Sequence, residues 1–366
     1  MFSFRSSYPI ALDIGNQNVY AVQLKDSKMG FLVKELAHGE LNGSGEDSPE
    51  TSHVLISKLR DIVKSKRFVG RRAIAHIPSQ RVFSFPIQFQ VRKSETLEEA
   101  ILRESREYLP FPVEEAVIDY PSIVALPTGE SEQYKATIAA VRSGHVTQYV
   151  HDLKKIGLTL EAVDLSICSL IRLHKHLHDM SPNPVILCNI GQTQSLFSVV
   201  ASDTILAQRN VSWGIQTLYD RILANLGLSE DQHKAKVLLK KHGLLYDDPQ
   251  QSGGLEEGVE MDQLNRTIYQ IITPHVEELI YEFHKLIGYV RSEEQNPAFE
   301  RICLYGHSIF IRRLDHYLEK RLNIPTKLVN PMAESELCED GMLPEISEGA
   351  PYALALGLAM RKVNWL

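Results

Sequence analysis

The sequence predicts an α/β protein of two similarly built domains, the first of which carries a small α+β insert. Three observations support this prediction. Residues 11–24 and 186–200 both have the pattern of a strand, a glycine turn and a second strand. Residues 79–156 have the pattern strand, helix, strand, strand, helix. Residues 300–329 have the pattern of a strand, a glycine turn, a helix and a strand, which is typical of α/β folds.

The size and hydropathy of the chain exclude several classes of protein. Its 366 residues, 43% of them hydrophobic and 23% charged, are enough to bury the cores of two domains. The best apolar run, residues 352–360, is about half of the roughly 18–20 residues that a membrane-spanning helix needs. The signal peptide of a secreted chain would be most hydrophobic around position 13, where this chain has the charged residue Asp13. We therefore expect a protein that stays inside the cell and has no membrane span.

The charge and the cysteines exclude further classes. A formal net charge of −7 and a pI near 6.1 argue against a nucleic-acid-binding surface, which needs clustered Lys and Arg to displace counterions from phosphates. The four cysteines lie far apart without Cys-x-x-Cys spacing, so neither a zinc site nor a redox pair is indicated. Nucleic acid is therefore not an expected partner.

The two predicted hairpins are alike in sequence. Each has an apolar strand, then Asp13 or Asn189, an isoleucine, Gly15 or Gly191, three polar residues and a strand of alternating pattern. Two half-molecules built alike usually face a shared cleft, where we expect a ligand site. Tight turns favour glycine for conformational reasons as well, so the glycines alone do not establish a ligand.

The other predicted elements follow from apolar periodicity, caps and turn residues. Within the insert, Ser94 is the predicted cap of a helix that runs to Tyr108, where Pro110 and Pro112 follow. A later helix, residues 163–179, carries Asp164 near its start. The remaining predicted strands are residues 72–77, 81–89, 116–124, 134–141, 300–305 and 326–329, and the remaining predicted helices are residues 54–66, 144–156, 213–226, 229–241, 264–290, 310–322 and 349–361.

The order of these parts resembles that of actin-like ATPases, which have a ribonuclease-H-like fold of two domains. The five segments shared by that superfamily correspond to residues 12–24 and 185–200 for the phosphate hairpins, 302–316 for the adenosine turn, and 163–177 and 352–360 for the connecting helices. Actin and the heat-shock chaperones carry a different subdomain at another place. The insert at residues 79–156 instead resembles that of FtsA-like and PilM-like proteins.

Two segments resemble the PilM family of type IV pilus assembly proteins in particular. They are LEEAILRESREYLPFPVEEAVIDY at residues 97–120 and GHSIFIRRLDHYLEKRLNIPTKLVNP at residues 306–331. The resemblance covers nearly the whole chain. It implies a first domain of residues 1–78 completed by 157–180 and 343–366, the insert at 79–156, and a second domain at 181–342 whose helical part is about 211–299.

The resemblance also implies a site for ATP and Mg²⁺. Backbone amides at the hairpin tips would hold the β- and γ-phosphates, and Asp13 would position Mg²⁺ through water. The positions that match the nucleotide site of the superfamily are Asp13, Gly15, Asn16, Gln17, Asn189, Gly191, Gln192, Gly214, Lys240, Gly306, His307 and Ser308.

Several positions depart from the pattern that the resemblance implies. Asn189 replaces an aspartate, so a neutral carbonyl stands where a charge would act on the metal. Asn16 and Tyr20 stand where Ser or Thr and a Lys are usual. His307 replaces a second glycine, and Val237 replaces a glutamate that binds ribose. The resemblance implies that these departures weaken ATP hydrolysis more than ATP binding. We therefore assign no catalytic residue and leave open whether the protein binds ATP.

The function implied by the resemblance is that of a cytoplasmic scaffold, peripheral to the inner membrane through its partner. It would bind the N-terminal tail of a PilN-like bitopic membrane protein. Pilus motor ATPases and a second copy of the chain are further candidate partners. Phe83, Phe85, Tyr108 and Phe111 are candidate lining residues of a peptide groove on the insert, although aromatic residues beside strands usually belong to the core.

Two alternatives stay open on sequence grounds. An active ATPase or kinase of the same superfamily would use Asp13 and both hairpins for phosphoryl transfer, but a kinase also needs a base carboxylate, and no clear candidate is present. An FtsA-like division protein would end in a linker and an amphipathic membrane-binding helix. Here residues 362–366 directly follow the last predicted helix, which disfavours that reading and also the GspL kind of secretion protein.

Overall fold

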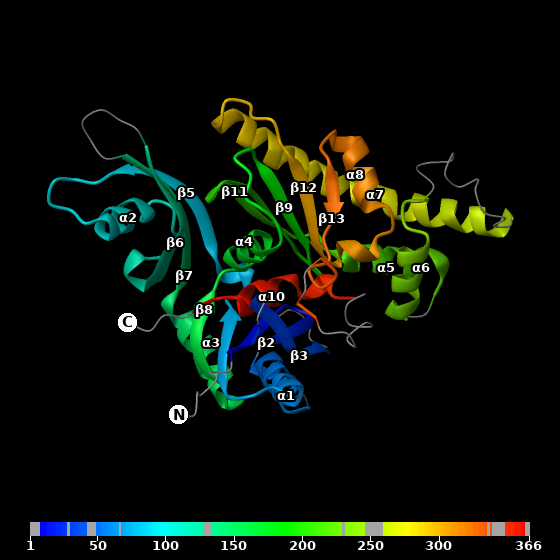
Figure 1. Ribbon diagram of the computed structural model, residues 1–366, viewed down its shortest axis with the longest axis horizontal. Helices are drawn as coiled ribbons and strands as arrows, with labels where there is room; N and C mark the ends of the chain where they lie inside the picture. The colour runs from blue at the N-terminus through cyan, green and yellow to red at the C-terminus, as the bar shows by residue number, and fades with distance from the viewer. Residues whose placement is uncertain are drawn as a thin grey trace. The chain divides into compact units, whose positions relative to one another are not determined.

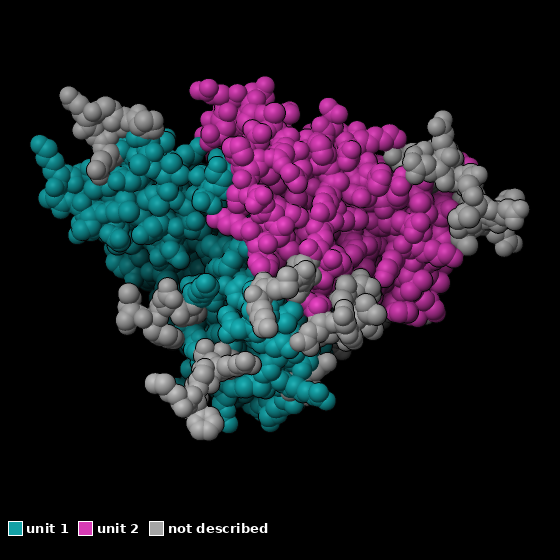
Figure 2. Space-filling model, in the orientation of Figure 1, with its two compact units in different colours: residues 1–172, 201–206, 355–366 teal, residues 173–200, 207–354 magenta. Residues whose placement is uncertain are grey.

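The computed structural model describes residues 8–27, 30–41, 49–65, 67–126, 133–228, 231–245, 259–334, 337–338 and 348–362. The chain divides into two compact units (Figure 2). Unit 1 comprises residues 1–172, 201–206 and 355–366, and unit 2 comprises residues 173–200 and 207–354. Most of the final segment that bears on the FtsA-like alternative, residues 363–366, lies outside the described residues.

Unit 1 is built on a five-stranded sheet in the order β3-β2-β1-β4-β8 (Figure 1). The first three strands along the chain pair antiparallel, whereas β4 runs parallel to β1 and β8 runs parallel to β4. Apolar side chains of α1 and α3 join those of the sheet in one core cluster. The bounds are β1 Ile10–Ile14, β2 Asn18–Ser27, β3 Gly30–Glu40, β4 Arg72–His76, β8 Thr159–Asp164, α1 Pro49–Ser65, α3 Ser143–Lys155, α4 Ser166–Leu177 and α10 Ala353–Ala359.

The insert of unit 1 is an antiparallel sheet in the order β5-β7-β6, covered by helix α2. Its strands are β5 (Phe83–Gln90), β6 (Ala116–Leu126) and β7 (Gln133–Arg142), and α2 spans Leu97–Ser105. The apolar side chains of β5 alternate with exposed polar ones, so one face of the sheet packs against α2 and forms a small separate core.

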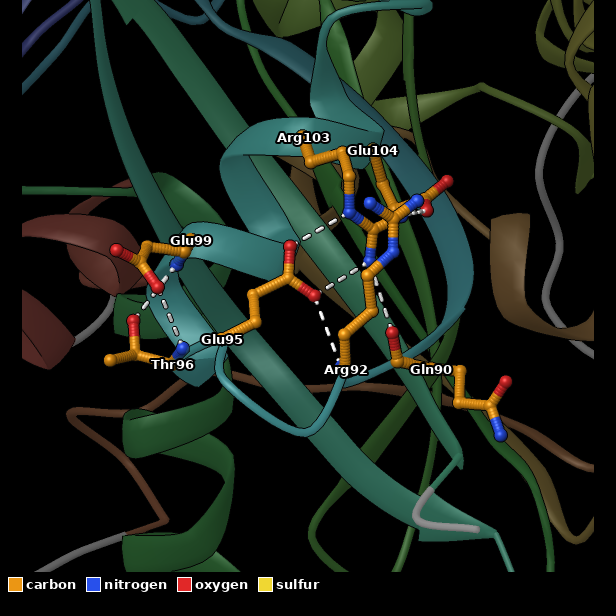
Figure 3. Close-up of polar contacts among 7 residues, drawn as sticks. All are labelled: Gln90, Arg92, Glu95, Thr96, Glu99, Arg103 and Glu104. Carbon is orange, nitrogen blue, oxygen red and sulfur yellow. Dashed lines mark hydrogen bonds and ion pairs between the residues drawn. The ribbon is translucent and has the colours of Figure 1, made fainter.

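Helix α2 begins at Thr96, and the predicted cap at Ser94 is wrong. The Thr96 hydroxyl accepts from the Glu99 amide at 3.2 Å, and the Glu99 carboxylate accepts from the Thr96 amide at 2.8 Å (Figure 3). This reciprocal capping box satisfies two amides, which a serine two residues earlier cannot do.

Unit 2 repeats the sheet architecture in the order β11-β10-β9-β12-β13. β9 and β10 form an antiparallel hairpin, and β12 runs parallel to both β9 and β13. Among the described residues, no helix of either unit is both long and apolar enough to span a membrane. The bounds are β9 Val185–Ile190, β10 Ser195–Ala201, β11 Thr204–Val211, β12 Arg301–Gly306, β13 Thr326–Leu328, α5 Ile215–Leu226, α6 Gln232–Lys241, α7 Val259–Glu293 and α8 Leu314–Leu322.

The structure corrects the sequence prediction at several elements. Strands β3, β8 and β11 were not predicted, because each is an edge strand, with weaker alternation than a central one. The helix predicted from residue 163 begins at Ser166, because Val163 and Asp164 pair with β4 instead. The predicted helix 310–322 is a 3-10 turn, His307–Phe310, followed by α8, and the final helix is only Ala353–Ala359.

Candidate functional site

The two hairpin tips have the same backbone geometry. In the first tip, Ile14 lies opposite Val19, and the Gly15 amide donates to the Asn18 carbonyl at 2.9 Å. In the second tip, Ile190 lies opposite Ser195, and the Gly191 amide donates to the Gln194 carbonyl at 2.9 Å. The internal similarity found in the sequence is therefore also a similarity of register and turn.

Asp13 is the second-last residue of β1, the strand that leads into the first tip, and its side chain is 17% exposed. One carboxylate oxygen, Oδ1, lies 3.2 Å from Nδ1 of His76 at the end of β4. The other ring nitrogen of His76, Nε2, lies 2.7 Å from the hydroxyl of Ser169 on α4. His76 and Ser169 are both buried. The orientation of the Asp13 carboxylate is thus fixed from two other elements.

The polar residues of the first tip are held by the chain around it. The Gln80 amide donates to the Asn16 side-chain carbonyl at 2.7 Å. The Gln17 carbonyl accepts from the Leu41 amide at 2.6 Å. The tip is therefore a rigid turn in which Gly15 is the one residue without a side chain to obstruct a ligand.

Asn189 and Ser308 are the most informative residues of the second tip. Both are buried, and neither the Asn189 Oδ1 atom nor the Ser308 Oγ atom has a hydrogen-bond partner among the described residues. Gly306, which lies opposite Ile190 in the sheet, brings the backbone before Ser308 close to this tip. Buried polar atoms are nearly always paired, so these two unpaired oxygens, one on β9 and one on the 3-10 turn His307–Phe310, are candidate contacts for a ligand.

The amides at the start of helix α5 are already occupied. Ile215 and Gln216 donate to the carbonyls of Gly191 and Gln192 at 3.1 and 2.9 Å, and Thr217 donates to its N-cap. A helix N-terminus can bind an anion only through amides that are free. Here the first turn of α5 fastens the second tip instead of offering donors to a phosphate.

Gly214 is the N-cap of α5, where any side chain would collide with the tip. A Cβ atom there would lie 2.3 Å from the Gln192 carbonyl oxygen. The Gln192 side-chain amide donates to that of Gln216 at 2.7 Å, so it points to α5. Gly214 therefore packs against the tip, and the Gln192 side chain is held toward α5.

His307 and Lys240 lie on elements next to the second tip. His307 is buried, with Nδ1 3.2 Å from the Ile190 carbonyl. Lys240 on α6 is exposed, with Nζ 5.9 Å from the centre of the Phe310 ring. Lys236 lies closer to that ring, at 4.3 Å, and also pairs with Glu348 at 3.5 Å. The cation that covers the 3-10 turn is thus Lys236, which the sequence interpretation missed.

The insert carries an exposed aromatic cluster, defined as Phe83, Phe85, Tyr108 and Phe111. Phe85 and Tyr108 stack with ring centres 4.8 Å apart, and Phe83 meets Phe111 edge to face at 5.4 Å. Phe83 remains 38% exposed and Tyr108 51% exposed, whereas Phe111 is buried beneath the Arg142 guanidinium. Tyr108 and Phe111 follow the end of α2 along the chain, whereas Phe85 on β5 also packs against the core cluster of the insert.

A polar hollow of about 470 Å³ lies at the other end of β5, where Gln88, Gln90 and Arg103 are among its lining residues. Arg103 donates to both oxygens of Glu95, at 2.8 and 3.0 Å, and to the Gln90 carbonyl at 3.0 Å (Figure 3). The Arg103 side-chain hydrogen bonds lower the pKa of Glu95 to about 2. The positive charge of Arg103 is thus already paired with Glu95. We therefore interpret the hollow as part of the structure of the insert and not as a ligand site.

A profile of the family described as "Type IV pilus assembly protein PilM" matches residues 11–250 and 260–363, which is most of the chain. The chain belongs to the PilM family.

Solved structures agree with this assignment at the level of the fold. A chain of the structure described as "PilM-PilN type IV pilus biogenesis complex" superposes with a TM-score of 0.76 at 22% identity, covering 96% of this chain and 98% of that one. The ethanolamine utilization protein EutJ from Carboxydothermus hydrogenoformans gives 0.54 at 12% identity, with 96% and 89% covered. The predicted actin-like fold is confirmed.

In this member of the PilM family, the predicted site residues gather at two places. Asp13, Gly15, Asn16 and Gln17 form the first tip in unit 1. The predicted residues of unit 2 gather around the second tip, except Lys240 on α6: they are Asn189, Gly191, Gln192, Gly214, Gly306, His307 and Ser308. The sequence interpretation missed His76 and Gln80 beside the first tip, because no local pattern shows which distant residues reach it.

Proposed function

We propose that this PilM-family protein is a scaffold of a type IV pilus assembly complex, on the cytoplasmic face of the inner membrane. It holds the N-terminal tail of a PilN-like bitopic membrane protein, which keeps it at the membrane. Family membership and the likeness to a chain of a PilM–PilN complex support this proposal. The observation that carries it is the aromatic cluster, which leaves two large apolar side chains exposed on one subdomain.

The chemistry of the cluster suits an extended tail with apolar side chains. Covering Phe83 and Tyr108 removes apolar surface from water, which stabilises a complex by about 25 cal/mol per Å². Two ion pairs lie near the aromatic rings: Arg142 with Glu115 at 3.3 Å, and Arg106 with Glu114 at 2.9 Å. An apolar centre with a charged rim is the usual composition of a protein interface.

Replacing both Phe83 and Tyr108 by alanine is expected to weaken tail binding roughly 30-fold, because an aromatic anchor at an interface usually contributes more than 1 kcal/mol. The measurement is isothermal titration calorimetry with a synthetic peptide of the PilN-like cytoplasmic tail. Leu102→Ala is the matched control, since Leu102 is a similarly exposed apolar residue of the insert, on α2 and outside the cluster.

Either of two results would contradict the proposal. The first is a wild-type protein that does not bind the tail. The second is a Leu102→Ala variant that loses as much affinity as the double variant. Pilus motor ATPases and a second copy of the chain stay candidate partners, and no contact among the described residues favours either of them.

We further propose that the protein binds ATP with Mg²⁺ through its hairpin tips. The unpaired Asn189 Oδ1 and Ser308 Oγ atoms support this proposal, because a bound nucleotide or its water would satisfy them. Among the described residues, no group of three or more His, Cys, Asp or Glu side chains is spaced to hold a metal. Mg²⁺ would therefore take most of its ligands from phosphate and water, with Asp13 acting through water.

Ser308→Ala is expected to change stability and ATP affinity in opposite directions. Removing a buried hydroxyl that has no partner stabilises the protein by about 1 kcal/mol, whereas losing a ligand contact weakens ATP binding about 5-fold. Thermal unfolding and calorimetric titration with ATP and Mg²⁺ measure the two effects. Ser198→Ala is the control, since that buried hydroxyl bonds the Ala207 carbonyl at 3.4 Å; it should lose stability and keep its ATP affinity. Unchanged ATP affinity in Ser308→Ala would contradict the assignment.

A further inference from the structure

The end of the unit 1 sheet that lies opposite the first hairpin tip is strongly basic. Strand β1 leads into the tip and runs parallel to β4, so β4 and its parallel neighbour β8 begin at the far end, shortly after α1 and α3 end. The segments that meet there, residues 60–72 and 152–161, hold eight Lys or Arg residues but three Asp or Glu. The whole chain has a net charge of −7, so this positive charge is local.

Two hydrogen bonds show that these segments lie together. The Arg60 guanidinium on α1 donates to the Lys155 carbonyl at the end of α3 at 3.1 Å. The Thr159 amide at the start of β8 donates to the Arg71 carbonyl at 2.7 Å, just before β4 begins. The cations of α1, of α3 and of the connection between α1 and β4 therefore occupy one end of unit 1.

Part of this charge is paired within the protein. Arg72 pairs with Glu161 at 3.2 Å, and Lys155 pairs with Asp152 at 2.9 Å. Four other cations of these segments are exposed and make no ion pair with any described residue. We call these four residues the basic end: they are Lys64, Arg67, Arg71 and Lys154. Their charges are available to an anion outside the protein.

Helix termini explain two of these four cations. Lys64 lies in the last turn of α1 and Lys154 in the last turn of α3, where a cation stabilises the partial negative charge of the helix end. Arg67 and Arg71 lie outside any helix. The Glu35 carboxylate accepts from the Arg67 backbone amide at 3.2 Å and makes no ion pair with its guanidinium. The charges of the two arginines therefore have no structural role in unit 1.

An exposed apolar side chain, Val69, stands between these two arginines in the chain. Val69 is 48% exposed, although its backbone is fixed. Its amide donates to Gln23 Oε1 at 2.8 Å, and its carbonyl accepts from Gln23 Nε2 at 2.7 Å. Gln23 is fully buried, and the neighbouring Phe68 packs against the core of unit 1. The fold thus presents a valine to solvent from a rigid segment that carries two unpaired cations.

We propose that the basic end binds the anionic headgroups of a lipid bilayer, with Val69 inserted at the boundary between headgroups and acyl chains. Cations beside an apolar side chain are the composition that suits this interface. A nucleic acid would also attract the arginines, but its phosphates offer nothing to a valine. The inference goes beyond the proposed function, because the contact with lipid is direct and needs no PilN-like tail.

The first test is cosedimentation of the full chain with vesicles, without any tail peptide. The wild type should bind vesicles of equal parts phosphatidylglycerol and phosphatidylcholine, and should not bind vesicles of phosphatidylcholine alone. Replacing Arg67 and Arg71 together by glutamine should weaken binding about 30-fold, since each cation near an anionic surface contributes about 5-fold. Replacing both by lysine should preserve binding, because lysine keeps the charge.

The matched control replaces Arg221 and Arg312 together by glutamine. Both arginines are exposed residues of unit 2 that make no ion pair with a described residue, and the net charge changes by the same amount. This variant should keep the vesicle affinity of the wild type. Thermal unfolding should be the same in all of these variants, because the altered side chains are exposed.

The second test replaces Val69 by serine and distinguishes a bilayer from a nucleic acid. Loss of the half-exposed valine should weaken vesicle binding about 3-fold, because less apolar surface leaves water. The same proteins are titrated with a double-stranded DNA oligonucleotide, which the wild type should bind more weakly than the anionic vesicles.

Any of three results would overturn the inference. The first is a wild type that does not bind the anionic vesicles. The second is an equal loss of vesicle affinity in the Arg67 and Arg71 glutamine variant and in the control. The third is a wild type that binds the DNA more tightly than the vesicles, which would assign the basic end to a nucleic acid. None of these results depends on the tail peptide, so the test remains decisive if the proposed function fails.

Discussion

Replacing Asp164 by alanine is expected to destabilise unit 1 by about 3 kcal/mol, because it removes a buried carboxylate that pairs with two arginines. The Asp164 side chain is only 5% exposed, and its oxygens lie 3.0 Å from Arg172 Nη2 and 3.1 Å from Arg361 Nη1. Arg172 also donates to the Gly357 carbonyl at 2.6 Å, and Arg361 to the Val163 carbonyl at 3.2 Å. Asp164 therefore joins the end of β8, helix α4 and the C-terminal segment.

The loss of stability is measured by urea unfolding, with the hydrogen exchange of unit 1 amides as the readout. Asp152→Ala is the matched control, since Asp152 pairs with Lys155 at 2.9 Å on one face of α3. A partly exposed pair of this kind contributes less than about 1 kcal/mol. Similar losses in the two variants would show that the shared carboxylate has no special role. If Asp164→Asn loses less stability than Asp164→Ala, the result supports a special role of this carboxylate, because the amide oxygen of asparagine still accepts a hydrogen bond from one arginine.

Gly306→Ala is expected to destabilise unit 2 by about 3 kcal/mol or more, through backbone strain and a steric collision. Gly306 has φ +71° and ψ −136°, which residues with a side chain rarely adopt. A Cβ atom would lie 2.3 Å from the Ile190 carbonyl oxygen and 2.8 Å from Asn189 Oδ1. Neither the backbone of β9 nor the buried Asn189 can move away without disturbing the second tip.

The control for this variant is Gly288→Ala, on helix α7 of the same unit. A Cβ atom at Gly288 meets nothing within 4 Å. Alanine in a helix interior is about 0.5–1 kcal/mol more favourable than glycine, so this variant should gain stability. Fluorescence of Trp213, which is buried in unit 2, follows unfolding in a Trp365→Phe background. Equal effects of the same sign at both glycines would refute the argument from backbone geometry.

Asp164 lies where the sequence predicted a helix start, but its ion pairs are visible only in the structure. The sequence interpretation placed this residue near the start of a helix, and α4 does begin two residues later, at Ser166. Its ion pairs with Arg172 and Arg361 could not be predicted, because Arg361 is nearly two hundred residues away along the chain. A similar limit applied to Lys236, whose place over Phe310 depends on how α6 packs beside a distant turn.

The sequence by itself determined the fold, the two hairpins and the family, because these depend on patterns that are local in the chain. A glycine turn closes through a hydrogen bond between residues three apart, as at Gly15 and Gly191, so a short motif is enough to predict it. Only the tertiary structure brought His76 and Gln80 to the first tip and left Asn189 and Ser308 unpaired at the second. Contacts between residues more than sixty positions apart depend on strand order and packing, which no single segment of the sequence contains.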